Sequence, residues 1–520
     1  MKPHLTLILA SALAFASCAS HQTPGELRTG DDCIAQTIYG QVQGYCDDGI
    51  YTFKGIRYAK AERFMAPEAP DSWEGVLKTQ AYGPKAMQGQ SVEWTGQPSD
   101  YDFGFEFKNE KLSEDCQVLN VWTPALDGKK RPVFLWIHGG GYASGSAIFL
   151  PAQDGRSLAE RGDIVVVTVN HRLNVLGYID LTALGGKYSE SVNLGQQDLV
   201  KALEWVHDNI EAFGGDPGCV TIGGQSGGGG KTSTLMAMPS AQGLFHRAIV
   251  QSGSTLRQAE PEQSRALGLE FVKQLGLEPG PDVDLSGFTY EELNDAANRA
   301  SRISRGGRLS PVVDGKYLVQ HPFDPVAPEC SRNVPMLIGS NLNEFCYTNN
   351  IVIDEAQARE RLAASIGADK CDDFIAEFDR VYPGQSPKEW VNTDFRTRGR
   401  VLEQATVKSA QGAAPAYVYL FTFKSGVNDG ALAACHGMEL PFMFANVAAQ
   451  REMTGGTVEA YKVEDIVSSA WISFIRTGRP SAKGLPAWEP FTAENGATMV
   501  LDGTPKLEHH HDAALLEYFK

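Results

Sequence analysis

The sequence predicts an α/β fold, a mostly parallel β-sheet covered by helices. Two continuous apolar runs, residues 132–137 and 164–169, are typical of buried strands. Between the second run and a third at 220–222, apolar residues recur at helical spacing over residues 193–213. Because apolar strands alternate with a helical segment, we expect a parallel sheet with helices on its faces.

Length and composition are those of a protein with a sizeable core. The chain has 520 residues, of which 42% are hydrophobic and 21% charged. No internal repeat or low-complexity linker divides it, so we expect residues 33–520 to form a single domain. The net charge of −17 argues against nucleic acid or an anionic membrane as the main partner.

The N-terminus has the pattern of a secretory signal peptide. The apolar run Leu5–Ala16 has about a dozen residues, too few to span a bilayer. Cys18 follows small residues, as at a bacterial lipoprotein cleavage site, although Phe15 stands where such sites usually have Leu. We therefore expect a signal at residues 1–18, export, and a polar tether at 19–32 that a lipid on Cys18 could anchor. An ordinary signal cleaved nearby is the alternative.

The turn after the third apolar run has the pattern G-x-S-x-G, from Gly224 to Gly228. This is the nucleophile elbow of α/β-hydrolases, a sharp turn between a strand and a helix. Glycines tolerate the strained turn, and the helix N-terminus favours negative charge that develops beside the serine. The pattern predicts that Ser226 is a nucleophile, with a glycine-rich turn and a capping serine as the alternative.

A phosphate-binding loop is a second interpretation of the same region. Gly230, Lys231 and Thr232 match the end of the pattern G-x-x-x-x-G-K-[ST]. The first glycine of that pattern falls on position 225, which is Gln, so this interpretation fails by one residue.

Three consecutive glycines follow the strand at 132–137, in the stretch from His138 to Gly141. Such turns supply main-chain N–H groups that bind the oxyanion in lipases and esterases. With an elbow downstream, Gly140, Gly141 and Gly227 are the candidates for the oxyanion hole. His138 is expected to be a structural hydrogen-bonding residue.

Several stretches together resemble the type-B carboxylesterase family, which includes the cholinesterases. The resemblance covers roughly residues 37–490, and the stretches that carry it are Phe53–Ala59, Ser113–Cys116 with Leu119–Trp122, Asn193–Gly228, Gln251–Ser254, Pro311–Gly315 and Trp471–Pro480. It implies an α/β-hydrolase catalytic domain with large loop and helical insertions. It also implies ester hydrolysis through an acyl-enzyme, without a cofactor or a metal.

The family motifs also indicate the acid and the base of a catalytic triad. Glu344 lies in the G-x-N-x-x-E stretch, although the family usually has Asp and Gly where Asn343 and Phe345 stand. His436 lies in the stretch H-G-x-[ED]-[LI]-x-[FY]. The order Ser226, Glu344, His436 is that of α/β-hydrolases. Asp314 lies in a Val-Asp-Gly stretch that indicates a turn.

Two further departures from the family concern the elbow and the cysteines. The family commonly has Glu and Ala where Gln225 and Gly227 stand, so a charge beside the nucleophile is missing. Cys33 and Cys46 flank an expected hairpin and are a plausible disulfide pair. The usual partner of Cys116 is Met87 here, and a bond between Cys346 and Cys435 would join the acid and histidine loops.

The sequence therefore predicts an exported serine carboxylesterase acting on small-molecule esters. Two alternatives stay open, a non-catalytic cholinesterase-like binding module and a hydrolase of the same fold acting on lactones or carbamates. No cysteine spacing indicates a zinc site, and the run His509–His511 is more typical of a solvated segment than of a metal site. Substrate loops are expected at residues 82–107 and 283–310.

Overall fold

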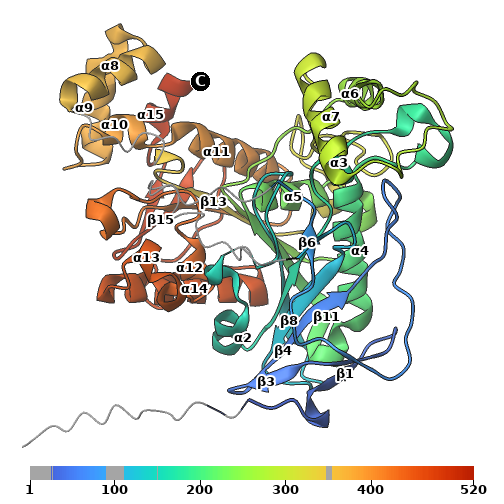
Figure 1. The fold of residues 1–520 in the computed structure, drawn as a ribbon. Helices are drawn as coiled ribbons and strands as arrows, with labels where there is room; N and C mark the ends of the chain where they lie inside the picture. Colours follow the sequence, from blue (N-terminus) through green and yellow to red (C-terminus); the bar gives the residue numbers. More distant parts are fainter. Residues whose placement is uncertain (1–24, 26, 90–110, 149, 347–353) are drawn as a thin grey trace, which may run out of the picture.

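The computed structural model describes residue 25 and residues 27–89, 111–148, 150–346 and 354–520. A large twisted sheet runs through the centre, and helices surround it (Figure 1). The expected signal, Cys18 and half of the tether lie outside the described residues, as does much of the loop expected at 82–107. Within the described ranges, no helix is long and apolar enough to cross a membrane.

The central sheet has eleven strands, and its middle is parallel, as the sequence predicts. All neighbouring pairs from β10 to β15 in the sheet are parallel, whereas β8, β4 and β3 at one edge and β16 at the other are antiparallel. In sheet order the strands are β16 (Lys506–His509), β15 (Ala497–Leu501), β14 (Ala416–Phe421), β13 (Met336–Asn341), β12 (Arg247–Gln251), β11 (Gly215–Gln225), β9 (Arg131–Ile137), β10 (Val165–Val169), β8 (Val118–Thr123), β4 (Ile50–Arg57) and β3 (Tyr45–Asp47).

Five short strands form two small sheets beside the large one. They are β1 (Ile34–Gln36), β2 (Gln41–Gln43), β5 (Val76–Lys78), β6 (Lys85–Ala86) and β7 (Leu112–Ser113). The expected hairpin is the antiparallel pair of β1 and β2.

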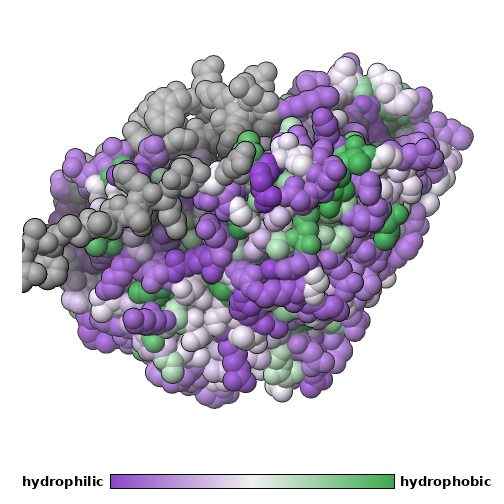
Figure 2. Space-filling model, turned by 90° about the horizontal axis from the view of Figure 1, so that it is seen from below, coloured by the Kyte–Doolittle hydropathy of each residue, from purple (hydrophilic) through white to green (hydrophobic). Residues whose placement is uncertain are grey.

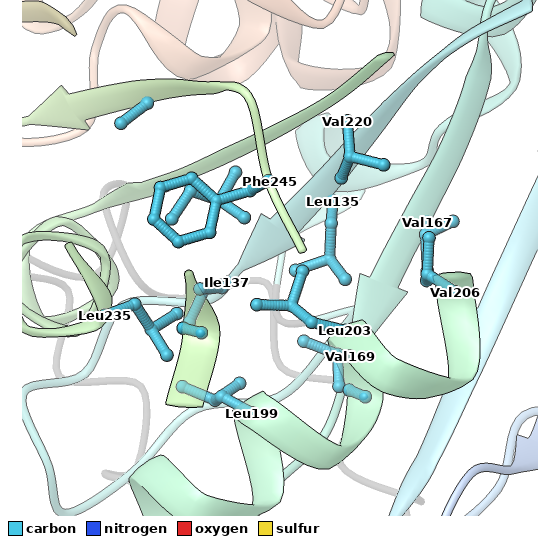
Figure 3. Packing of buried hydrophobic residues seen from close by; sticks show 14 of the residues in the cluster. Leu135, Ile137, Val167, Val169, Leu199, Leu203, Val206, Val220, Leu235 and Phe245 are labelled. Carbon is cyan, nitrogen blue, oxygen red and sulfur yellow. The ribbon is translucent and has the colours of Figure 1, made fainter. Parts of the chain in front are cut away.

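Side chains of β9 alternate between two hydrophobic clusters, one on each face of the sheet. Leu135 packs in the cluster that contains residues of α4, whereas Trp136 packs with residues of α14. Both side chains are fully buried. Figure 3 shows part of the first cluster, where residues of α4 pack against β9, β10 and β11: Leu135, Ile137, Val167, Val169, Leu199, Leu203, Val206 and Val220. This burial on both faces explains why the strands are apolar throughout.

The helices form a covering layer and two outlying groups. The predicted helix at 193–213 is α4, continued by a 3₁₀ turn at Ile210–Phe213. In Figure 1, α8, α9 and α10 stand apart from α3, α6 and α7. The α-helices are α2 (Arg156–Gly162), α3 (Asn174–Tyr178), α4 (Leu194–Asn209), α5 (Gly227–Leu235), α6 (Pro261–Gln274), α7 (Tyr290–Ile303), α8 (Glu355–Ile366), α9 (Cys371–Val381), α10 (Glu389–Asn392), α11 (Phe395–Ser409), α12 (Leu440–Met443), α13 (Arg451–Thr454), α14 (Val458–Thr477) and α15 (Ala513–Leu516).

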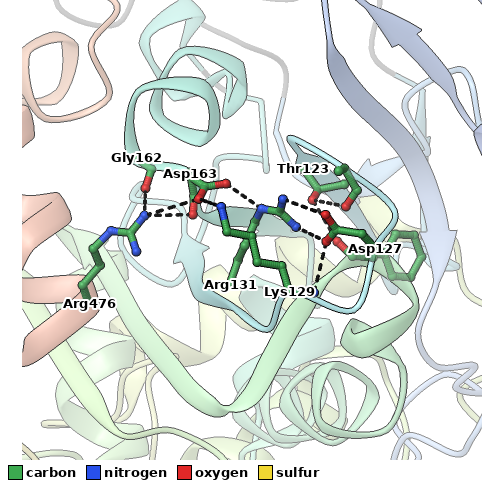
Figure 4. A network of polar contacts seen from close by, with 9 residues as sticks. Thr123, Asp127, Lys129, Arg131, Gly162, Asp163 and Arg476 are labelled. Carbon is green, nitrogen blue, oxygen red and sulfur yellow. Dashed lines mark hydrogen bonds and ion pairs between the residues drawn. The ribbon is translucent and has the colours of Figure 1, made fainter.

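A buried arginine anchors the start of β9, the strand that leads into the glycine turn (Figure 4). The Nε atom of Arg131 lies 2.6 Å from Oδ1 of Asp163, and its Nη2 atom lies 3.1 Å from Oδ2 of Asp127. Arg476 of α14 donates to the main-chain oxygen of Asp163 at 3.0 Å. The side chain of Arg131 is only 5% exposed, so these carboxylates compensate a charge held away from water.

The outer surface is dominated by hydrophilic residues, with hydrophobic ones scattered among them on the face shown in Figure 2. That face is typical of a protein whose apolar residues are used in a core.

The expected disulfides are not formed in the described part of the chain. Both Cys33 and Cys46 are directed at Arg28. The Cys33 thiol donates to the Arg28 oxygen at 3.6 Å, and Nη2 of Arg28 lies 3.3 Å from Sγ of Cys46. The structure also has no bond between Cys346 and Cys435, whose side chains are buried. Burial raises the pKa of the Cys116 thiol above its ordinary range.

Candidate active site

Ser226 occupies a strained turn between β11 and α5. Its φ is 58° and its ψ is −123°, a conformation that side chains rarely adopt. The Ser226 N–H donates to the Gln251 oxygen at the end of β12, at 2.8 Å. A Cβ atom on Gly228 would lie 2.0 Å from the Ile137 oxygen, so only glycine fits there. Strand, sharp turn and helix follow one another as the elbow pattern predicts.

The glycine turn lies beside the elbow because β9 and β11 are parallel neighbours. Ile137, the last residue of β9, pairs with Gly224 of β11. Beyond it, Gly140 and Gly141 have φ values of 82° and 61°, which glycine adopts without strain. A Cβ atom on Gly227 would lie 2.5 Å from the Gly141 nitrogen, so the two main chains are in direct contact.

His436 and Glu344 form a short, buried contact. The His436 Nδ1 atom lies 2.5 Å from Oε2 of Glu344, and both side chains are at most 4% exposed. The other carboxylate oxygen of Glu344 accepts the main-chain N–H of Asn341 at 2.8 Å. The main-chain N–H of His436 donates to the main-chain oxygen of Glu344 at 2.6 Å. The carboxylate is therefore fixed by the main chain at the end of β13, and it orients the imidazole.

Gln225 connects the His436–Glu344 pair to the elbow. Its Nε2 atom lies 3.1 Å from Nε2 and 3.3 Å from Nδ1 of His436. Because the amide nitrogen is nearly equidistant from two nitrogens of one ring, it lies over the ring face rather than in line with either nitrogen. The imidazole is thus in contact with the residue that immediately precedes Ser226.

Asp314, His138 and His509 have structural partners of their own. Asp314 accepts the main-chain N–H groups of Tyr317 at 3.1 Å and Leu318 at 2.8 Å, as expected of a turn. The Nδ1 atom of His138 lies 2.9 Å from the Gly139 oxygen, so this histidine has a structural hydrogen bond. His509 pairs with a glutamate at 3.1 Å, and no metal-binding cluster of three or more residues occurs in the described ranges.

Comparison with known proteins gives one consistent family. The family model described as "Carboxylesterase family" matches residues 31–383 and 393–518. The chain is 33% identical over 494 residues to the para-nitrobenzyl esterase of Bacillus subtilis, covering 92% of this chain and 96% of that protein. The chain belongs to the carboxylesterase family. It is therefore an ester hydrolase with the α/β-hydrolase fold, as the sequence predicts.

Two further relatives extend the similarity. Phenmedipham hydrolase of Pseudarthrobacter oxydans is 32% identical and covers 90% of this carboxylesterase and 94% of its own length. A solved esterase of anaerobic Clostridium hathewayi, described as able to hydrolyse aliphatic aromatic polyesters, superimposes with a TM-score of 0.87 at 35% identity. That alignment covers 96% of this chain and 99% of the other.

Phe345, like Gln225, is a departure from the carboxylesterase pattern that contacts His436. Its ring stacks on the imidazole of His436, with centroids 4.4 Å apart and an interplanar angle of 30°. The residue is 48% exposed although it is large and apolar. The sequence shows that an aromatic residue replaces the usual glycine after Glu344, but not where its ring points.

A second buried carboxyl group, that of Glu439, lies close to the His436–Glu344 pair of this carboxylesterase. Glu439 accepts the side-chain amides of Asn341 at 2.5 Å and Gln251 at 3.1 Å. Burial and the neighbouring charge of Glu344 raise its pKa to about 7. Trp471 extends the network by donating to Gln251 at 3.1 Å. The acidic position in the family's histidine motif signals this residue, but not its contacts.

The region that resembles a phosphate-binding loop is the interior of α5. Lys231 is fully buried there, and its Nζ atom donates to the main-chain oxygen of His138 at 3.2 Å. Burial lowers the pKa of Lys231 to about 7. The lysine therefore contacts the start of the glycine turn instead of facing an open loop.

Proposed function

We propose that Ser226, His436 and Glu344 are the catalytic triad of a carboxylic-ester hydrolase that works through an acyl-enzyme. The observation that carries the proposal is the 2.5 Å contact between His436 and Glu344, with the imidazole held against the residue before Ser226. Nδ1 carries the proton in that contact, so Nε2 is the basic nitrogen.

In the first half of the reaction, Oγ of Ser226 attacks the ester carbonyl carbon and its proton passes to Nε2 of His436. The carbonyl oxygen becomes an oxyanion, which the N–H groups of Gly140, Gly141 and Gly227 bind. When the tetrahedral intermediate collapses, the bond to the alcohol oxygen breaks and the imidazolium protonates that oxygen. The alcohol leaves, and the acyl group remains on Ser226.

In the second half, water replaces the alcohol. His436 takes a proton from the attacking water, and the same main-chain N–H groups bind the second oxyanion. Collapse breaks the bond to Oγ of Ser226, which recovers its proton from His436. Glu344 stays ionised throughout and stabilises the imidazolium. No step needs a cofactor or a metal.

The proposed substrates are small-molecule carboxylic esters. Lactones and carbamates remain second candidates, because the same attack and collapse serve them. A panel of p-nitrophenyl acetate, butyrate, octanoate and laurate, with one lactone and one aryl carbamate, tests the assignment. Turnover of the esters above the rate of the Ser226→Ala variant is expected. Turnover of only the carbamate or only the lactone would contradict the proposed ester substrate.

We also propose that the chain is exported and tethered through a lipid on Cys18, with residues 33–520 as one catalytic domain. The support is the signal pattern in residues 1–18 and a family match that spans nearly the whole domain. Intact-mass analysis of the native protein should give an N-terminal lipidated Cys18. An unmodified chain that begins at another residue would exclude the anchor.

A further inference from the structure

The ring of Phe345, which is stacked on His436, has no part in the proposed mechanism. Phe345 stacks on the imidazole at 4.4 Å, and 48% of the residue remains exposed. The exposed part of this apolar residue lies next to the proposed reacting groups, where it can contact a substrate. The ring therefore does more than fill space in a core.

The main chain around Phe345 is hydrogen-bonded to neighbouring segments. The Leu342 N–H donates to the Phe421 oxygen of β14 at 2.9 Å, and the Asn343 N–H donates to the Ala434 oxygen at 3.1 Å. The Cys346 N–H donates to the Asn343 oxygen at 2.8 Å. These bonds fix the main chain around Phe345, and the stacking on His436 orients its ring, so the ring is pre-organised.

Because Phe345 lies beside His436, its ring contacts one particular half of an ester substrate. His436 protonates the leaving alcohol in the proposed mechanism, so the alcohol oxygen lies next to the imidazole when the bond breaks. A group attached to that oxygen therefore lies near whatever covers the imidazole. The acyl group, which stays on Ser226, need not approach Phe345.

We propose that Phe345 is a specificity-determining residue that receives the alcohol half of the ester and favours a flat, aromatic alcohol. The inference rests on the proposed function of Ser226 and His436. Aromatic rings prefer offset-stacked or edge-to-face contacts with one another, and such contacts add to simple apolar burial. An aliphatic alcohol of the same size gains only the free energy of apolar burial.

A hollow of about 280 Å³ on another side of Phe345 lies outside the reacting centre. Its lining includes Phe345, Phe395 and Phe519, but neither Ser226 nor His436. Phe519 is an aromatic residue of the same hollow, stacked on Phe395 with centroids 5.1 Å apart. It therefore provides a matched control for the loss of an aromatic ring from this region.

The test compares benzyl acetate with cyclohexylmethyl acetate, which share the acyl group and nearly share size, but differ in aromaticity. The ratio of the two kcat/KM values is divided by the ratio of their alkaline hydrolysis rates. Wild type is expected to favour the benzyl ester. Phe345→Leu should lower the corrected ratio by about 2- to 12-fold, the worth of one aromatic pair. Phe345→Tyr should retain the preference.

Two controls separate specificity from damage. The ratio for methyl phenylacetate over methyl cyclohexylacetate, which differ on the acyl side, should be the same in wild type and Phe345→Leu. Phe519→Leu should leave the benzyl ratio unchanged. The inference is overturned if Phe345→Leu does not lower the benzyl ratio, shifts both ratios equally, or behaves like Phe519→Leu. If wild type hydrolyses none of these esters and no p-nitrophenyl ester, the proposed function fails instead.

Discussion

The side-chain amide of Gln225 lies over the imidazole of His436, 3.1 Å from Nε2. A neutral amide is therefore in direct contact with the proposed base, at a position where the family motif commonly has Glu. This contact gives residue 225 an influence on the protonation of the imidazole and on the charge that a substrate meets.

Gln225→Glu should shift the pH dependence of catalysis. A carboxylate against the imidazole favours the charged ring, so a lower proton concentration is needed to obtain the neutral base. We expect the acid limb of the kcat/KM profile to move upward by roughly half to one pH unit. Relative activity on quaternary-ammonium esters should rise. Superimposable acid limbs would show that residue 225 and His436 are not coupled.

Gly227→Ala introduces the residue that the family commonly has, yet it should impair this enzyme. The added Cβ atom would lie 2.2 Å from the Gly141 oxygen, so the glycine turn must shift. Displacement of one oxyanion donor lowers kcat by roughly 10²- to 10³-fold. Gly230→Ala is the control within α5, because its Cβ would meet no atom closer than 3.0 Å. Equal kcat values for the two variants would contradict the proposed oxyanion hole.

Lys231→Met should stabilise the protein at neutral pH. The Lys231 pKa falls from 10.5 to about 7 on burial, so between these values the unfolded chain binds a proton that the folded chain does not. The burden that Lys231 places on stability is therefore absent above pH 10.5 and grows as the pH falls toward 7. The buried rings that face this amine, His138 and His171, also have pKa values lowered mainly by burial.

The methionine variant lacks this titration and should gain roughly 1–4 kcal/mol at pH 7. Thermal unfolding midpoints from pH 7 to pH 10 measure the effect, and the advantage should shrink as the pH rises. Lys78→Met, at an exposed position of β5, controls for the loss of a surface charge. A constant difference across this range would mean that Lys231 is not held neutral by burial.

Glu344→Gln should be far more damaging to turnover than Asp314→Asn. Glu344 is in contact with His436, and loss of the orienting acid typically lowers kcat by roughly 10⁴-fold. Asp314 only accepts main-chain N–H groups, which an asparagine oxygen can also accept. We expect its kcat to stay within a few fold of wild type. Steady-state kinetics on p-nitrophenyl butyrate measure both, and the reverse order would remove Glu344 from the triad.

Local sequence patterns predict the parts of this enzyme that depend on neighbours in the chain. The elbow at Ser226 follows from glycines within two residues, and α4 follows from spacing within one helix. The order of Ser226, Glu344 and His436 follows from family motifs. Each of these signals is complete within a short segment.

Contacts between distant segments of the chain could not be predicted from the sequence. Gln225 and His436 are 211 residues apart, and Lys231 meets a carbonyl 93 residues away. No periodicity encodes such contacts, because they depend on which strands become neighbours in the sheet. The expected disulfide between Cys33 and Cys46 is not formed, and each sulfur atom contacts Arg28 instead, which their positions beside a hairpin do not reveal.

The most direct test of the proposed triad is active-site labelling with a fluorophosphonate, read by peptide mass. One label per chain, on Ser226, should accompany complete loss of esterase activity. Folded Ser226→Ala, verified by circular dichroism, should take up no label, and its turnover should fall by on the order of 10⁴-fold or more. A label on another residue, or esterase activity retained by the folded variant, would contradict the assignment of Ser226 as the nucleophile.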